Sequence, residues 1–171
     1  MILRGGVKLP RSKKHLTERG FKETSDGTRE VRVPIHRDRD IVTARQEGRA
    51  LASLLGFSSG EATLVATAIS ELARNIVLYA KHGEIVVGLV RDGARQGVMV
   101  VARDEGPGIP DIPRALVAGH STSGGLGLGL PGVSKLMDEL HISSEVGKGT
   151  TVVAKKWKGW PSSWPNGRPP P

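Results

Sequence analysis

Apolar and polar residues recur along the chain with two different periods. In residues 29–35, REVRVPI, apolar residues alternate with polar ones or proline, which predicts a strand with one buried face. Residues 38–55 and 59–80 instead have apolar residues three or four positions apart, as in helices that bury one side. Gly56 is a helix-stop signal between them, and either serine at 58–59 can cap the second helix.

The second half of the chain contains more strands than helices. Two strands, 84–90 and 97–103, are predicted on either side of a turn at Asp92-Gly93. A helix is expected over about 130–140, and a hairpin over 141–156 closes the pattern. Strands that cluster without regular alternation with helices favour an α+β fold, in which a mixed or antiparallel sheet is covered by helices on one face.

The helix predicted over 59–80 carries two polar residues within an apolar sequence. At 100° per residue, one sector of it contains the expected core positions, which are Val65, Ala68, Ile69, Leu72, Ile76 and Tyr79. Glu71 and Asn75 are one turn apart at the edge of that sector, close enough to hold one ligand together. An ordinary solvated helix edge is the alternative.

A short loop motif, DEGPGIP at 104–110, follows the strand 97–103 directly. A carboxylate at Asp104 could accept a hydrogen bond from a ligand amine. Gly106 and Gly108 permit close approach of the backbone and unusual dihedral angles. A tight turn with a capping aspartate is the alternative.

A glycine-rich segment, GHSTSGGLGLGLPG at 119–132, runs into the start of a predicted helix. Such a segment can wrap phosphates with backbone N–H groups and the helix dipole. It is not a dinucleotide fingerprint, because no strand directly precedes it, and the chain has no Walker lysine motif. The alternative is a flexible linker that binds nothing.

The net charge of +8 comes from the two ends of the chain. Residues 1–30 contain eight basic and four acidic residues, and residues 155–171 contain four basic residues and no acidic one. Between them, residues 31–154 contain thirteen of each sign. Basic ends can contact nucleic acid or acidic partners, but a neutral centre does not favour specific nucleic-acid binding.

Composition predicts one folded domain with a tail at each end. We expect a disordered basic arm over 1–28, a single domain over 29–157 and an irregular Trp/Pro-rich tail over 158–171. The absence of cysteine excludes disulfides and thiolate metal sites. There is no signal-peptide pattern and no run of about 20 apolar residues that could span a membrane, so we expect a cytoplasmic protein.

Four features in fixed order resemble the ATP-binding domain shared by DNA gyrase, Hsp90-type chaperones, histidine kinases and MutL. They are Glu71-x-x-x-Asn75, Asp104-x-Gly106-x-Gly108, the glycine-rich segment 119–132, and Gly147-x-Gly149-Thr150. The resemblance implies the Bergerat ATP-binding fold, a two-layer α/β sandwich with a mixed sheet, over about residues 30–157. Within that superfamily, SELARNIVLYA, DEGPGIPDI and STSGGLGLGLPGVSKLMDE look like the RsbT-type serine/threonine kinases.

The resemblance also implies roles for individual residues. Asn75 is expected to coordinate a Mg²⁺ that bridges the ATP phosphates, and Glu71 to act as general base. Asp104 is expected to accept from the adenine amino group, with Thr150 sharing a water. The other implied nucleotide-binding residues are Gly106, Gly108, Ile109, His120, Ser121, Thr122, Leu126, Leu128 and the four glycines expected to form a lid over the phosphates, Gly124, Gly125, Gly127 and Gly129. The cation for the γ-phosphate is left open among Arg74, His120 and a residue of a partner.

The implied function is a Mg-ATP-dependent protein serine/threonine kinase in bacterial stress or sigma-factor signalling. Its expected substrate is a STAS-domain antagonist or scaffold protein, and its expected downstream partner is a PP2C-type phosphatase. One alternative is an anti-sigma-type module that binds nucleotide and sequesters a partner with little transfer. Another is a nucleic-acid-linked ATPase, suggested by the basic ends. No membrane partner is expected.

Overall fold

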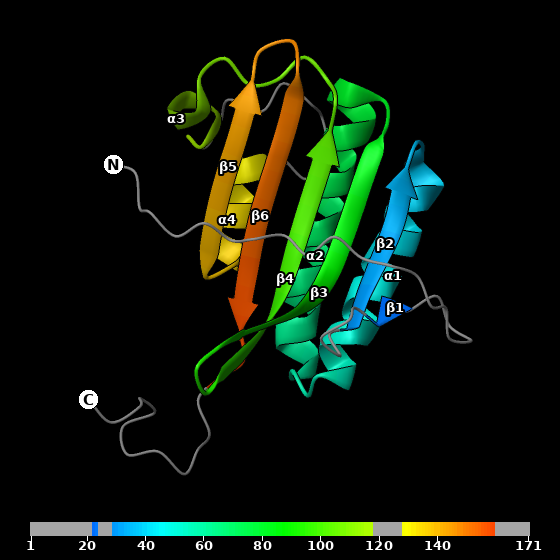
Figure 1. Ribbon diagram of the computed structural model, residues 1–171, viewed down its shortest axis with the longest axis vertical. Coiled ribbons are helices and arrows are strands. Elements are labelled where there is room, and N and C mark those ends of the chain that lie inside the picture. Colours follow the sequence, from blue (N-terminus) through cyan, green and yellow to red (C-terminus); the bar gives the residue numbers. More distant parts are fainter. Residues whose placement is uncertain (1–21, 24–28, 118–127, 160–171) are drawn as a thin grey trace.

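One antiparallel sheet with helices on one face forms the part of the chain that the computed structural model describes, residues 22–23, 29–117 and 128–159. The six strands have the order β1-β2-β3-β4-β6-β5, and Figure 1 shows α1, α2 and α4 behind them. In chain order the elements are β1 (Lys22–Glu23), β2 (Arg29–Ile35), α1 (Asp38–Leu54), α2 (Ser59–Asn75), the π-helix η1 (Ile76–Ala80), β3 (Gly83–Asp92), β4 (Arg95–Asp104), α3 (Ile112–Ala115), α4 (Gly129–Leu136), β5 (Glu139–Glu145) and β6 (Gly149–Trp157).

The α+β class and the two layers are confirmed. Of the mixed or antiparallel sheet that the pattern left open, the antiparallel one is found, so the mixed sheet implied by the resemblance is wrong. Every strand pairing among the described residues is antiparallel. Strands β4 and β5 run in the same direction, but β6 lies between them and pairs with both. The sequence pattern does not reveal this arrangement, because it shows that a strand exists without showing where that strand enters the sheet.

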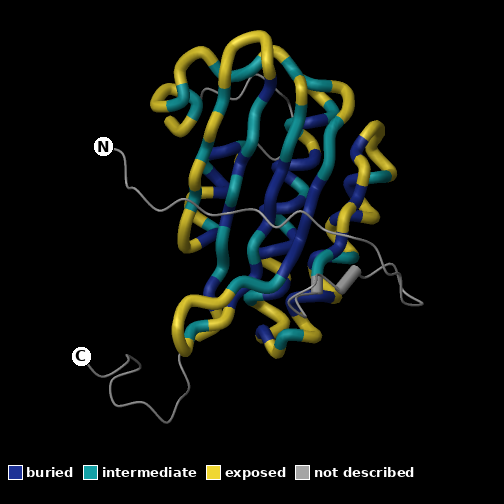
Figure 2. The backbone as a smooth tube through the Cα atoms, viewed as in Figure 1, coloured by how far each residue is buried: buried dark blue, intermediate teal, exposed yellow. Residues whose placement is uncertain are grey.

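The first half of the chain folds as its apolar pattern predicts. Val31, Val33 and Ile35 of β2 are buried against the helices, and Figure 2 shows such buried positions along the strands and the inner sides of the helices. At Gly48, an added Cβ would lie 2.0 Å from Cδ1 of Ile69. Glycine at this position therefore lets α1 and α2 pack closely, which brings α2 onto the sheet.

Ser58 is the residue that caps α2. Its hydroxyl oxygen accepts from the backbone N–H of Glu61 at 3.2 Å, and the Glu61 carboxylate accepts from the backbone N–H of Ser58 at 2.8 Å. This reciprocal pair is a capping box, which satisfies two backbone donors that the first helical turn leaves without partners.

The C-terminal part of the helix predicted over 59–80 differs from the prediction. The α-helix ends at Asn75, and the next five residues, Ile76–Ala80, form the π-helix η1. A π turn contains more residues than an α turn, so the side chains beyond it are rotated relative to the apolar stripe. Ile76 remains buried, but Tyr79 is 51% exposed, and its prediction as a core residue is wrong.

Pairing within the sheet also changes the boundaries near residue 140. Helix α4 ends at Leu136, although the following residues favour a helix, and β5 begins at Glu139. The backbone N–H of Asp138 donates to the carbonyl of Lys155 at 2.9 Å, and the Asp138 carboxylate accepts from the backbone N–H of Trp157 at 2.7 Å. These bonds to β6 outweigh local helix propensity.

Two short elements were not predicted. Helix α3 follows the DEGPGIP motif, and strand β1 at Lys22–Glu23 pairs with the edge strand β2. For those two residues the expectation of a disordered arm over 1–28 is wrong. The predictions for residues 1–21 and 24–28 of that arm, and for the tail from residue 160, lie outside the described residues.

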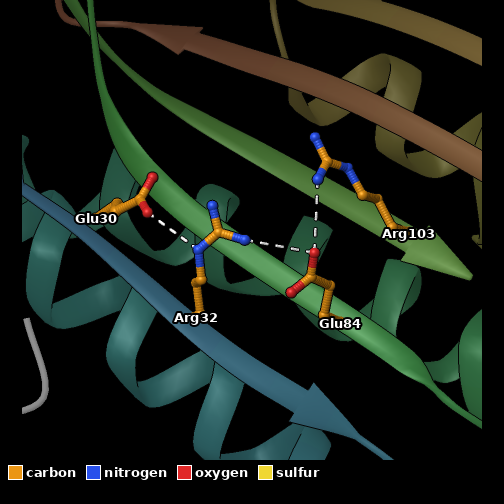
Figure 3. Close-up of polar contacts among 4 residues, drawn as sticks. All are labelled: Glu30, Arg32, Glu84 and Arg103. Carbon is orange, nitrogen blue, oxygen red and sulfur yellow. Dashed lines mark hydrogen bonds and ion pairs between the residues drawn. The ribbon is translucent and has the colours of Figure 1, made fainter. Parts of the chain in front are cut away.

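The face of the sheet opposite the helices carries a row of paired charges. Figure 3 shows Glu84 between Arg32 and Arg103, and Oε1 of Glu84 lies 3.6 Å from an Nη1 atom of each arginine. On the same face Lys155 pairs with Glu139, whereas Lys156, opposite the core residue Val98 in the sheet, pairs with Asp138 on the helix side. These cations are bonded within the fold, so they add no support to the nucleic-acid alternative.

No helix in the described ranges is long and apolar enough to cross a membrane.

Candidate functional site

A cavity of about 270 Å³ lies at the end of the sheet where β4 finishes. This volume is close to the lower end of the roughly 300–1,000 Å³ typical of small-molecule sites. Its described lining comes from α2 and η1, from β4 and β6, from the loop after β4, from α3 and from the start of α4. The lining residues are Leu72, Asn75, Ile76, Tyr79, Ala102, Asp104, Pro107, Gly108, Ile109, Pro110, Ala115, Gly129, Leu130, Pro131, Thr150 and Val152.

Asp104 is the only acidic residue among these lining residues, and the backbone fixes its orientation. Its Oδ1 accepts from the N–H of Gly106 at 2.9 Å and from the N–H of Thr150 at 3.3 Å. Neither of these two bonds uses the second carboxylate oxygen, Oδ2, and Asp104 lines the cavity. The wall thus presents a carboxylate acceptor in a defined direction.

The Thr150 hydroxyl is positioned by a residue that the sequence did not suggest, Ser144 of β5. The two hydroxyl oxygens are 2.9 Å apart. Ser144 also donates to the carbonyl of Gly149 at 2.9 Å and accepts from the N–H of Ile109 at 2.8 Å. Because Ser144 has a single hydroxyl proton, donation to Gly149 leaves Thr150 as the donor between the two hydroxyls. No motif marks Ser144, since its role depends on the register of β5 and β6.

The two glycines of the DEGPGIP motif are required by packing. An added Cβ at Gly106 would lie 2.7 Å from Cβ of Ala80, and one at Gly108 would lie 2.4 Å from the carbonyl oxygen of Glu145. Gly108 also has a φ of +76°, which disfavours other residues. Gly108 lines the cavity, whereas Gly106 is outside the lining and supplies the N–H that holds Asp104.

The helical wheel placed Glu71 and Asn75 together at the edge of the apolar sector. The structure separates their environments. Asn75 lines the cavity, but Glu71 is only 7% exposed and is not among the lining residues. Its Oε2 accepts from the backbone N–H of Gly129 at 3.0 Å. Packing of α4 on α2 buries this carboxylate, so the prediction of a helix edge between core and solvent is wrong for Glu71.

Most of the nucleotide-binding residues predicted in the glycine-rich segment lie outside the described residues. This applies to His120, Ser121, Thr122, Gly124, Gly125, Leu126 and Gly127. Of the two that are described, Gly129 lines the cavity, and Leu128 is exposed and does not.

The described lining includes no lysine or arginine. Arg74, one candidate for the γ-phosphate, is exposed on α2 and is not part of the lining. The described residues also contain no cluster of three or more His, Cys, Asp or Glu that could hold a metal. A metal ion bound at this site would therefore be held by Asn75, by the ligand itself and by groups outside this lining.

Several apolar residues of the wall were not predicted as site residues. Pro107 and Pro110 belong to the DEGPGIP motif, Leu130 and Pro131 belong to the glycine-rich segment, and Leu72 and Ile76 flank Asn75 on its helix, so the sequence did offer a signal for these six. The remaining wall residues come from separate elements that only the fold brings together, and they are Tyr79, Ala102, Ala115 and Val152. The cavity combines an apolar wall with a fixed carboxylate, an amide and a hydroxyl, which suits a flat, partly polar ligand.

Comparison with known proteins agrees with this geometry. Residues 60–158 match the family described as histidine kinase-, DNA gyrase B-, and HSP90-like ATPase. The chain is 52% identical over 125 residues to the serine/threonine-protein kinase RsbT of Bacillus subtilis (strain 168), covering 73% of this chain and 94% of that protein. It is also 33% identical over 121 residues to the anti-sigma F factor of Geobacillus stearothermophilus, covering 66% of this chain and 81% of that protein. The chain therefore belongs to the histidine kinase-, DNA gyrase B- and HSP90-like ATPase family, and within it to the RsbT type of serine/threonine-protein kinase.

Proposed function

We propose that this chain binds Mg-ATP in the described cavity and transfers the γ-phosphoryl group to a serine or threonine of a STAS-domain antagonist or scaffold protein. The observation that carries the proposal is the placement of Asn75, Asp104 and Thr150 on the wall of one cavity. The similarity to a protein named as a serine/threonine kinase supports the reaction type.

Asp104 and Thr150 form the adenine-recognising part of the proposed site. The carboxylate of Asp104 is held by two backbone N–H groups and accepts a hydrogen bond from the exocyclic amino group of adenine. Guanine carries a carbonyl oxygen at that position, which a carboxylate repels, so the site prefers ATP to GTP. The Thr150 hydroxyl, oriented by Ser144, shares a water with Asp104 and the base.

Asn75 is the proposed protein ligand of Mg²⁺. Its side chain lies on the cavity wall, and its amide oxygen is a hard donor of the kind that Mg²⁺ prefers. Sites of this metal commonly use one or two protein oxygens, with waters and substrate phosphates completing the shell. A single amide therefore fits, and no acidic cluster is needed. When bound, the ion neutralises charge on the phosphates.

Glu71 is the proposed general base. It accepts the proton of the acceptor hydroxyl while that oxygen bonds to the γ-phosphorus and the bond to the β,γ-bridging oxygen breaks, which leaves ADP. The position of the carboxylate one turn from Asn75 on α2 supports the assignment. Positive charge at the γ-phosphate comes from a residue outside the described lining, with Arg74, His120 and a residue of the partner as candidates.

The proposed biological role is partner switching in bacterial stress or sigma-factor signalling, carried out in the cytoplasm. Phosphorylation of the STAS-domain protein releases the kinase, which then binds and activates a PP2C-type phosphatase. The similarity to proteins named as anti-sigma factors supports a role in which binding to other proteins is part of the function.

The second candidate is a nucleotide-binding module that sequesters a partner with little phosphotransfer. It is favoured by the anti-sigma relatives and by the position of Glu71, whose carboxylate is bonded to Gly129 and is not part of the cavity wall.

The test is phosphotransfer from γ-labelled ATP to a purified STAS-domain protein in the presence of Mg²⁺. We expect label on a serine or threonine with the unmodified chain, and much less with Asn75→Ala or Asp104→Ala. A STAS protein whose acceptor is changed to alanine is the control. ATP binding without transfer would favour the sequestering module, and absence of ATP binding by the folded chain would overturn both candidates.

A further inference from the structure

The buried carboxylate of Glu71 joins two elements that are distant in the sequence. Its Oε2 accepts from the N–H of Gly129, the first residue of α4. Gly129 and the next two residues, Leu130 and Pro131, line the cavity. Glu71 itself lies outside the described lining, so this hydrogen bond reaches the wall of the site from behind and not from its interior.

The first turn of α4 offers few donors, which makes this bond the main polar anchor of the helix start. The first N–H groups of a helix have no partner within it. Here Pro131 has no N–H, and the N–H of Gly132 donates to the carbonyl of Leu128 at 2.6 Å. The N–H of Gly129 is directed instead to Glu71. A carboxylate is well suited to that position because the start of a helix is electropositive.

A bond of this kind is strong where water is scarce. Glu71 is 7% exposed, and in the described residues no buried side-chain polar atom lacks a partner. Removal of the carboxylate would take away the acceptor of the part-buried Gly129 N–H in the contact between α2 and α4, so a hydrogen bond to a charged group would be lost.

We propose that Glu71 is a positioning residue for the phosphate-side wall of the cavity: its carboxylate holds the first turn of α4 against α2, one helical turn from Asn75, and thereby sets nucleotide affinity. This role is separate from the acceptance of a proton. Its consequence for nucleotide binding rests on the proposed function, whereas its consequence for α4 does not.

The test compares Glu71→Ala with Glu71→Gln in the full chain without nucleotide. Glutamine keeps an acceptor oxygen at the same place and removes the base, whereas alanine removes both. Ser70→Ala is the matched control, because the Ser70 hydroxyl bonds to the carbonyl of Ala66 within α2 and not to α4. The measurement is hydrogen exchange of the backbone amides in 129–133, that is residues 129, 130, 132 and 133, with the amides of β4 reporting on the fold as a whole.

We expect exchange at 129–133 to accelerate about tenfold or more in Glu71→Ala, as for loss of a hydrogen bond to a charged group. In Glu71→Gln and in Ser70→Ala the exchange rate should stay within about threefold of that of the unmodified chain. Glutamine retains an acceptor oxygen for Gly129, and Ser70 makes no bond to α4. Unchanged exchange in Glu71→Ala would overturn the proposal. Equal acceleration in Glu71→Gln would also overturn it, because the acceptor oxygen would then not be what holds α4.

A second measurement separates positioning from chemistry. ATP affinity should fall about tenfold in Glu71→Ala and be largely restored in Glu71→Gln, whereas phosphotransfer should be lost in both. Equal ATP affinity in all three chains would refute the link to nucleotide binding. If the unmodified chain does not bind ATP, the proposed function fails, and the exchange experiment still decides whether Glu71 positions α4.

Discussion

Asp104 and Thr150 face each other across β4 and β6, and the N–H of Thr150 donates a hydrogen bond to Oδ1 of Asp104 at 3.3 Å. The N–H of Gly106 donates to the same oxygen at 2.9 Å. The carboxylate is therefore oriented by its own loop and by the neighbouring strand. Because the backbone fixes it, the acceptor for a ligand exists before any ligand binds.

Asp104→Asn should weaken ATP binding about tenfold to a hundredfold, with or without Mg²⁺. The amide can retain the acceptor at Oδ1, but it places an NH₂ donor where the carboxylate offers Oδ2 to the adenine amino group. Calorimetric titration of ATP and GTP measures the effect. Asp92→Asn, at the exposed far end of β3, is the control. Normal ATP affinity in Asp104→Asn would refute the adenine assignment.

Asn75→Ala should remove most of the dependence of ATP affinity on Mg²⁺, a loss of about tenfold in the presence of the ion. In the presence of a chelator, its affinity should match that of the unmodified chain, because the adenine contacts remain. Asn75 is only partly buried, so we expect little change in the thermal midpoint of unfolding. An unaltered response to Mg²⁺ would argue that the metal is bound elsewhere.

Gly149→Ala should destabilise the fold by more than about 3 kcal/mol, whereas Gly147→Ala should cost only about 1–2 kcal/mol. Both glycines have positive φ, +109° at Gly149 and +80° at Gly147. An added Cβ at Gly149 would lie 2.0 Å from the carbonyl oxygen of Asp104, whereas one at Gly147 would meet nothing within 4 Å. Urea unfolding of the two variants makes the comparison, and equal losses would show that the close approach of β6 to Asp104 is unimportant.

Ser58→Ala should lower the free energy of unfolding by about 1 kcal/mol near neutral pH. The Ser58 hydroxyl and then its backbone N–H lower the pKa of Glu61 below its ordinary value. A lowered pKa in the folded state stabilises the fold above the ordinary pKa of a glutamate, and this contribution is lost as the pH falls through the lowered pKa. Without the hydroxyl, the loss of stability on acidification should be smaller.

Urea unfolding of both chains from about pH 6 to pH 3 tests this prediction, because the window spans the ordinary glutamate pKa of about 4.3. The two stability curves should converge towards acid pH. Stability curves that stay parallel over the whole pH range would show that the Ser58 hydroxyl does not lower the pKa of Glu61.

The first half of the fold was predictable because its signals are local. Alternation in β2, apolar residues three or four apart in α1 and α2, and the capping pair Ser58 and Glu61 all act within one element. The site was partly predictable for a similar reason. Six of the predicted nucleotide-binding residues line one cavity, and they are Asn75, Asp104, Gly108, Ile109, Gly129 and Thr150.

What the sequence did not reveal depends on contacts between distant segments. The partner of Glu71 is 58 residues away, and the role of Ser144 follows from the register of β5 with β6. The π-helix after Asn75 rotates Tyr79 out of the core, and no composition signal in IVLYA distinguishes it from an α-helix. The group that contacts the γ-phosphate, left open among Arg74, His120 and a residue of a partner, is a further case, because the described wall contains no lysine or arginine.

The position of β6 has a consequence for how the protein is made. This strand comes late in the chain, yet it lies between β4 and β5 and supplies Thr150 to Asp104. A ribosome releases the chain from its N-terminus onward, so α1, α2 and the β3–β4 hairpin can form while β4 still has an unpaired edge. The cavity cannot close until residues 149–157 have left the exit tunnel. Until then the edge of β4 that β6 will cover is unpaired and can pair with another chain.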